Sequence, residues 1–149
     1  MYMTPKFSYS TASGSYSFEV SSNVVMCTFN GACCDQIAQR YLATLCKIVS
    51  DFNGEPWAYL GNAQLHLAAT PQAEQYLLEC FVMSVKNNCI GDAYCLTSAV
   101  GISQLKSIRQ KAGLTATLEE RMFGSQQSAF SQLTKELKQY SAVENSQEK

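Results

Sequence analysis

The sequence is short of charge and of long apolar runs, and each shortage argues against a class of protein. Charged residues are 15% of the 149 residues, and the 11 Lys and Arg and 12 Asp and Glu leave a net charge of -1. This balance argues against nucleic acid as a partner, because a phosphate backbone requires many basic contacts. No stretch approaches the roughly 18 apolar residues of a membrane span. The first twenty residues contain no apolar run typical of a secretory signal, so we expect a cytoplasmic protein.

The seven cysteines lack the spacing that marks a metal or redox site. No two of them form the C-x-x-C pattern of structural zinc sites and redox motifs. A disulfide-stapled scaffold is normally short and secreted, which does not fit the start of this chain. We therefore expect reduced thiols that serve mainly as small core residues. The sequence indicates no metal and no cofactor.

Short apolar segments alternate with amphipathic ones, which predicts strands alternating with helices. We expect strands at 16–20, 24–29, 56–60, 93–96 and, more weakly, 118–123. Helix patterns run from Ile37 to Phe52, from Thr70-Pro71 to Asn87-Asn88, from Ser98 to Gly113, and onward from Ser125. Asn30-Gly31 is expected to break the second strand, and Gly61–Ala69 is expected to be a connection.

This order predicts an α/β fold: a single-domain mixed, mostly parallel β-sheet of about five strands, with an N-terminal β-hairpin and about four helices. We place the domain at residues 16–140. Residues 1–15 are polar without a clear period, and we expect a flexible or loosely packed arm there. Residues 141–149 are polar and charged, and we expect a disordered tail.

Three segments of the chain resemble the STAS-like superfamily of anti-sigma factor antagonists, which shares its architecture with CRAL-TRIO lipid-binding domains. They read VVMCTFNGACCDQIAQRYLATL, then PWAYLG with TPQAEQYL, and finally MFGSQQSAFSQL. Together they cover about residues 16–140, and the order of elements carries more of the resemblance than any one residue. The resemblance implies a bacterial regulatory module. It would dock to another protein, such as a kinase or an anti-sigma-like factor, or to itself as a homodimer.

In the anti-sigma antagonist branch, a partner kinase phosphorylates a serine at the start of a helix that covers the sheet. The matching turn here reads HLAATPQAE, which has no Asp-Ser pair and offers Thr70 as its only hydroxyl at the helix start. The regulatory site is thus either lost or moved to Thr70. A phosphate there would be stabilised by the free N–H groups of the helix start. The ordinary interpretation is that Thr70 only caps the helix.

Two further local patterns have a functional and an ordinary interpretation. Asn30-Gly31 is a candidate anion cradle before a helix, or a plain strand-to-helix turn. Cys33 and Cys34 lie near a helix start, where a lowered pKa would make one thiol reactive. A Cys–His nucleophile pair would need His66, the only histidine, which by default is a loop residue.

Aromatic residues gather on the predicted core elements, where packing is the ordinary explanation. The resemblance also suggests that they could surround a small apolar ligand held between helices and sheet, which requires an accessible apolar cavity. These candidates are Trp57, Tyr59, Tyr76, Phe81 and Tyr94. A basic group, Lys106, Arg109 and Lys111, is expected on a solvated helix face, with docking to an acidic partner as the alternative.

The sequence contains no catalytic constellation, so we predict a non-enzymatic cytosolic protein-interaction or regulatory module of STAS-like type. The first alternative is a carrier or sensor of a small apolar ligand on the same fold. A weaker alternative is a thiol-dependent enzyme that uses Cys33 or Cys34.

Overall fold

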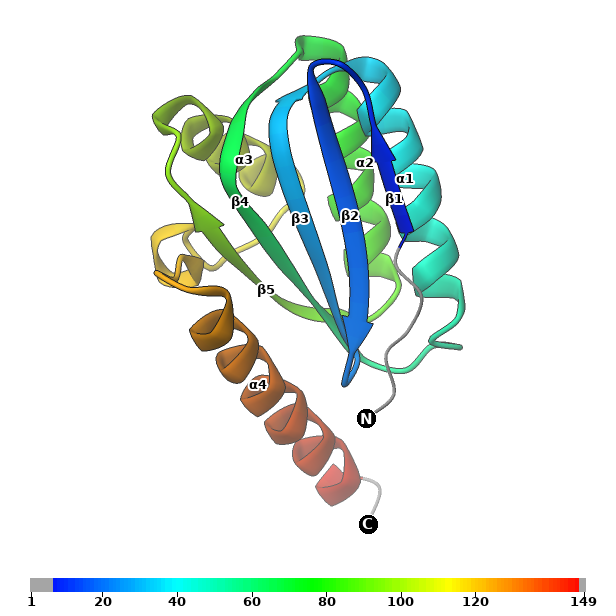
Figure 1. Cartoon of the computed structure of the whole chain (residues 1–149). Helices are drawn as coiled ribbons and strands as arrows, with labels where there is room; N and C mark the ends of the chain where they lie inside the picture. The colour runs from blue at the N-terminus through cyan, green and yellow to red at the C-terminus, as the bar shows by residue number, and fades with distance from the viewer. Residues whose placement is uncertain (1–6, 148–149) are drawn as a thin grey trace.

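The computed structural model describes residues 7–147 of the chain. Within that range, an N-terminal run of three strands is followed by alternating helices and strands, and the last three elements are helical (Figure 1). They are β1 (Phe7–Ser10), β2 (Gly14–Ser21), β3 (Val24–Cys33), α1 (Asp35–Ser50), β4 (Trp57–Ala69), α2 (Pro71–Lys86), β5 (Cys89–Leu96), α3 (Ala99–Lys111), the 3-10 helix η1 (Glu119–Arg121) and α4 (Gln126–Gln147).

The five described strands form one sheet in the order β1-β2-β3-β4-β5. The pairings β1–β2 and β2–β3 are antiparallel, whereas β3–β4 and β4–β5 are parallel. The predicted N-terminal hairpin of β2 and β3 is confirmed. The sheet is mixed rather than mostly parallel, because β1 adds a second antiparallel pairing beside the hairpin.

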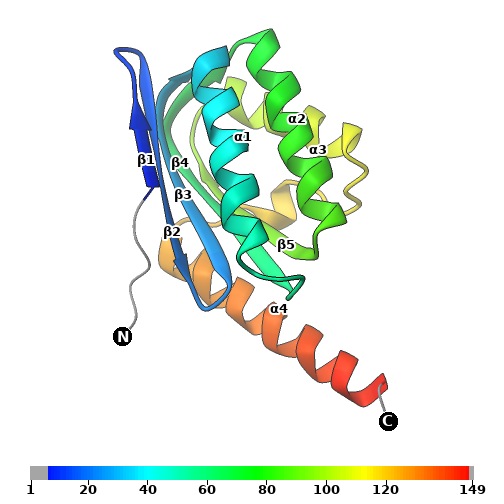
Figure 2. The same cartoon turned by 90° about the vertical axis from the view of Figure 1, so that its right-hand side faces the viewer.

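Side-chain alternation along the strands gives the sheet two apolar faces. On β3, Val25 and Cys27 point to the layer that α1 and α2 cover, while Val24 points to α4. Figure 2 shows α1, α2 and α3 on one side of the sheet and α4 on the other. The central strands are thus covered on both faces, which explains the nearly continuous apolar run of β3.

The helix boundaries follow the predicted signals. Thr70 caps α2, since its hydroxyl oxygen accepts a hydrogen bond from the Ala73 amide at 3.1 Å, and Pro71 occupies the first helical position. Gly54 and Gly113, which follow α1 and α3, both adopt φ of +84°. That left-handed conformation ends a helix most readily at glycine.

The predicted strand at 118–123 is wrong. Residues 119–121 form η1, and only Met122 makes a bridge to the sheet, beside Tyr94. The Arg121 side chain explains the different geometry, because its Nε donates to the Asp92 carbonyl at 2.6 Å and holds the segment across the edge of β5. The sheet still has five strands, because β1, near the N-terminal end of the chain, takes the place of the strand expected at 118–123.

The predicted connection at 61–69 is also wrong, because β4 continues to Ala69. Asn30-Gly31 does not end β3, which continues to Cys33 through a shift of register. Gly31 has φ of +76°, and a Cβ there would lie 2.4 Å from the Ser13 carbonyl oxygen. Glycine is required at this close approach, whereas the sequence pattern had suggested only a turn.

Described secondary structure extends into both segments that were expected to lie outside the domain. Within the expected arm, Phe7–Ser10 pairs with β2 and its aromatic side chains pack against the core. Residues 1–6 lie outside the described residues. Within the expected tail, α4 continues to Gln147. The described strands and helices therefore include residues on both sides of 16–140, and the bounds of the domain stay a prediction.

Candidate functional site

The carboxyl ends of β3 and β4 bring several of the predicted site residues together. Gly31 pairs with His66 across the two strands, and the Gly31 carbonyl oxygen lies 3.1 Å from His66 Nδ1. The Cys33 carbonyl accepts a hydrogen bond from the Thr70 amide at 3.0 Å. Asn30 and Gly31 lie inside β3, and anion binding at these residues stays a prediction.

Thr70 joins the starts of α1 and α2. Besides capping α2, its hydroxyl donates a 2.8 Å hydrogen bond to Asp35 Oδ1 in the first turn of α1. The side chain is exposed. A phosphate at this oxygen would meet the positive end of α2, but also the negative charge of Asp35. The phosphorylation of Thr70 stays a prediction.

Replacing Thr70 with alanine should destabilise the protein measurably. The variant T70A loses the cap of α2 and the link to Asp35, and such caps contribute about 1 kcal/mol, up to about 2 kcal/mol. Chemical denaturation of T70A, with T70S as the control that keeps the hydroxyl, measures the loss. Equal stability of wild type and T70A would contradict the capping geometry.

The structure does not give Cys33 the environment of a reactive thiol. Burial raises the pKa of the Cys33 thiol from 9.0 to about 12, and the neighbouring Cys34 and Asp35 add to the rise. A nucleophilic cysteine needs the opposite shift. Cys34 precedes α1 and is half-buried. His66 contacts Gly31 and the Phe29 ring, and burial lowers its pKa.

Thiol labelling over a pH series should separate the cysteines. At neutral pH we expect the exposed Cys46 to react at once and the buried Cys27, Cys33 and Cys80 to react only on unfolding. The folded state keeps the Cys33 proton between pH 9.0 and about 12, where the unfolded state loses it, so the free energy of unfolding should fall as pH rises through this window. Fast labelling of Cys33 at pH 7 would contradict the burial of this thiol in the folded state.

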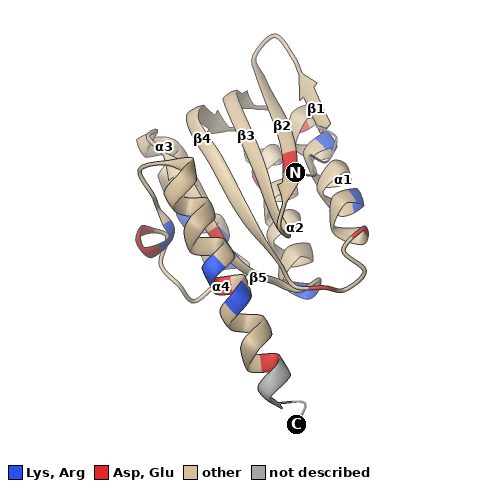
Figure 3. Ribbon diagram, turned by 60° about the horizontal axis from the view of Figure 1, so that its bottom comes forward, with Lys and Arg blue, Asp and Glu red and all other residues tan. Residues whose placement is uncertain are grey.

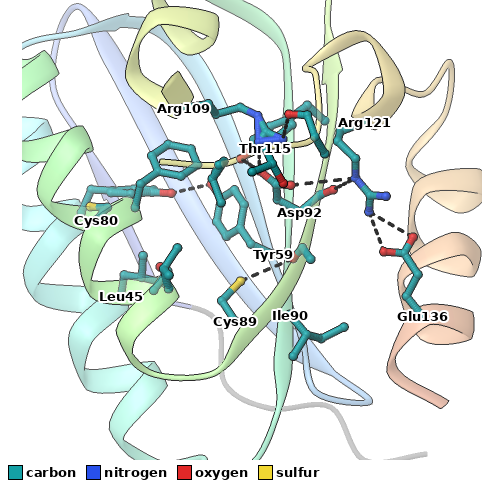
Figure 4. Close-up of a pocket in the computed structure, with 18 residues that line it drawn as sticks. Leu45, Tyr59, Cys80, Cys89, Ile90, Asp92, Arg109, Thr115, Arg121 and Glu136 are labelled. Atoms are coloured by element: carbon teal, nitrogen blue, oxygen red, sulfur yellow. Dashed lines mark hydrogen bonds and ion pairs between the residues drawn. The ribbon is translucent and has the colours of Figure 1, made fainter. Parts of the chain in front are cut away.

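A cavity of about 230 Å³ lies between α2, β5 and the segment after α3 (Figure 4). Its apolar walls include Leu45, Phe81 and Ile90. The exposed Thr115 and Ala116 contribute to its lining, so it opens to solvent beside them.

A second cavity of about 110 Å³ lies between the sheet and all three helices of this side. Its walls are almost wholly apolar, and Phe29, Leu77 and Leu105 belong to them. The two cavities share four wall residues, Tyr41, Tyr59, Phe81 and Tyr94. Of the five predicted aromatic candidates, Tyr59, Phe81 and Tyr94 line these cavities, whereas Trp57 and Tyr76 pack in the core around α1 and α2.

A network of charged side chains borders the first cavity. Arg109 Nη1 donates to Asp92 Oδ2 at 2.9 Å, and the Tyr94 hydroxyl donates to the same oxygen at 2.8 Å. Arg121 Nη2 donates to both carboxylate oxygens of Glu136, at 2.8 Å and 3.1 Å. Figure 4 shows the Arg109–Asp92 pair and the Arg121–Glu136 pair side by side.

The solvated face expected for Arg109 is therefore wrong. Arg109 is 2% exposed, because α3 turns it toward β5 and Asp92 compensates its charge. Lys106, in contrast, is exposed and pairs with Glu119. The sequence carried one usable signal for the network, namely a single acidic residue, Asp92, inside an apolar strand.

No protein-family model matches the chain, and no curated protein matches it. Among solved structures, the chain is similar to the crystal structure of an anti-sigma factor antagonist from Mycobacterium paratuberculosis, with a TM-score of 0.55 and 10% sequence identity. The match covers 87% of this chain and 94% of that chain. The chain therefore has a STAS-like fold, as the sequence predicted.

Within the described residues, no helix is long and apolar enough to cross a membrane. The same part of the chain holds no cluster of three or more His, Cys, Asp or Glu residues that could bind a metal ion.

Proposed function

We propose that this chain is a non-enzymatic regulatory module that works by docking to another protein. The fold that it shares with an anti-sigma factor antagonist is the observation that carries this proposal. A partner kinase or anti-sigma-like factor, or a second copy of the chain, fits a module of this fold. The cytoplasm is the compartment that we propose for it.

An exposed apolar patch offers a docking surface. Leu65 and Leu67 on β4 are 70% and 63% exposed, and they point to the same face of the sheet because they lie two residues apart on one strand. The Ser98 hydroxyl donates to the Leu67 carbonyl at 2.8 Å, which holds the start of α3 against this part of β4. Figure 3 shows that most charged residues lie on helices and loops and few on the strands. Exposed apolar residues that gather on one surface favour protein contact.

Affinity purification from cells of the source organism, read out by quantitative mass spectrometry, tests the proposal. The wild type is compared with L65S/L67S and with V143S, which removes another exposed apolar side chain, 56% exposed, from α4. We expect wild type and V143S to recover the same partner, and L65S/L67S to lose it. Equal recovery of the partner by all three proteins would contradict a docking role for Leu65 and Leu67. The absence of any partner, together with a monomer at high concentration, would overturn the docking function.

The paired cavities support a second function, that of a carrier or sensor of a small apolar molecule. Together they lie between helices and sheet, and their shared aromatic walls suit an apolar ligand. Native mass spectrometry of the purified protein is the test. A retained small molecule favours the carrier, and a clean monomer or dimer favours the interaction module alone.

A further inference from the structure

The two edges of the sheet are covered to different degrees. At the β5 edge, Tyr94 forms a bridge with Met122, and the Tyr94 carbonyl accepts a hydrogen bond from the Phe123 amide at 2.8 Å. At the other edge, β1 pairs with β2, and no other part of the described chain makes a backbone hydrogen bond to Phe7–Ser10. Figure 2 shows β1 at the outer edge of the sheet. An edge strand of this kind can accept a further strand.

The register identifies the open backbone groups of β1. The Thr11 amide donates to the Gly14 carbonyl at 2.8 Å, so the ladder of β1 and β2 is hydrogen-bonded at this pair. Hydrogen-bonded and non-hydrogen-bonded pairs alternate along an antiparallel ladder. Ser8 and Ser10 therefore fall on non-hydrogen-bonded pairs, and their N–H and C=O groups point away from β2. The FSYS segment also lacks the charge, proline or bulge that blocks many edge strands.

Two basic side chains of α1 lie over this edge strand. The guanidinium carbon of Arg40 lies 4.5 Å from the centre of the Tyr9 ring, and Lys47 Nζ lies 5.7 Å from the centre of the Phe7 ring. Both basic residues are exposed, and no carboxylate of the described residues forms an ion pair with either. The β1 edge thus carries a local positive charge, although the net charge of the chain is -1.

A strand added at this edge would place its side chains beside the two cations. Neighbouring strands lie about 4.8 Å apart, and side chains on one face repeat every second residue. A carboxylate beside Phe7 or Tyr9 on the α1 face is therefore within reach of Lys47 or Arg40. A second copy of the chain fits this edge poorly, because pairing of β1 with its own copy brings the same cations of both copies together.

We propose that the β1 edge binds an extended segment of a partner protein, with acidic residues at alternate positions, as a further strand of the sheet. The backbone of Ser8 and Ser10 supplies the main-chain hydrogen bonds, and Arg40 and Lys47 select acidic side chains. This inference rests on the docking function proposed above and adds a contact surface on β1 to the patch on β4.

Two capped peptides test the proposal on the full chain. In one, threonine alternates with glutamate, and in the other, glutamine replaces each glutamate. In a titration followed by amide chemical shifts, we expect the glutamate peptide to shift the Ser8 and Ser10 amides. It should bind about five-fold more tightly than the glutamine peptide, as two exposed ion pairs imply. Added salt should remove this difference, because it screens exposed charges.

Variants assign the effect to the edge and to its cations. R40Q/K47Q should bind the two peptides equally. K135Q/K138Q removes the same charge from exposed positions of α4 and should keep the preference for glutamate. S8P removes one outward N–H on an edge strand, where proline is tolerated, and should weaken the binding of both peptides.

Each contrary outcome has a distinct meaning. Equal binding of both peptides to the wild type overturns the acidic partner, and this comparison needs no variant. Shifts at Leu65 and Leu67 without shifts at Ser8 and Ser10 overturn the edge as the site. Shifts of Ser8 and Ser10 on raising the protein concentration alone overturn the partner segment in favour of a second copy. The absence of shifts with either peptide overturns the inference but leaves the docking function, which affinity purification tests independently.

Discussion

Replacing Asp92 with alanine is expected to cost about 3–5 kcal/mol of the free energy of unfolding, because it leaves the buried Arg109 charge without its partner. The side chains of Arg109 and Asp92 are 3% and 13% exposed, so water reaches them only slightly. The substitution also removes the acceptor of the Tyr94 hydroxyl. Denaturant titration of D92A against wild type measures the loss.

The exposed pair on the same side of the molecule provides the control. Glu119 pairs with Lys106 where their side chains are 59% and 49% exposed, so E119A removes one carboxylate of an ion pair at the surface. Exposed pairs contribute little, because water and salt screen them. We expect E119A to unfold like the wild type. Similar losses for E119A and D92A would contradict the burial of the Asp92 network.

Replacing Trp57 with alanine should cost about 3–5 kcal/mol, as for other fully buried large aromatic side chains. Trp57 is 0% exposed, and its ring stacks on Phe52 with centroids 5.8 Å apart. Its Nε1 donates to the Asn87 carbonyl at 2.7 Å, which ties the start of β4 to the end of α2. Calorimetric or denaturant unfolding of W57A gives the value.

The variant W57F separates packing from the hydrogen bond. It keeps an aromatic ring beside Phe52 but lacks the donor to Asn87, so we expect a loss clearly smaller than that of W57A. If W57A unfolded at the same denaturant concentration as the wild type, Trp57 would not occupy the core of the folded chain.

Most of the fold could be predicted from local sequence patterns. The Thr70-Pro71 start of α2 and the glycine after α3 could be predicted because helix ends depend on a few neighbouring backbone groups. The strand β1 was missed because its FSYS segment is short, and its aromatic side chains find their partners only across the sheet. The extension of β4 was missed for a similar reason. Side chains of distant residues, such as Gln104 at Ala69, hold its end.

The site was less predictable than the fold. Tyr59, Phe81 and Tyr94 could be named as candidates because aromatic residues on core elements border any space between helices and sheet. Arg109 appeared to belong to a solvated basic group, since helix periodicity does not reveal a carboxylate on another element. The link between Arg109 and Asp92 joins residues seventeen positions apart. It depends on how α3 packs beside β5, which no local pattern specifies.

The central claim is a five-stranded sheet in which β1, β2 and β3 pair antiparallel and β3, β4 and β5 pair parallel. Nuclear Overhauser effects between backbone protons of the isotope-labelled protein test it. The structure predicts cross-strand contacts between Cys27 and Gly61 and between Leu60 and Ala93, in parallel register, and between Phe7 and Phe18 in antiparallel register. Their absence, with helical contacts through Trp57–Ala69 instead, would contradict the sheet and the cavities that lie against it.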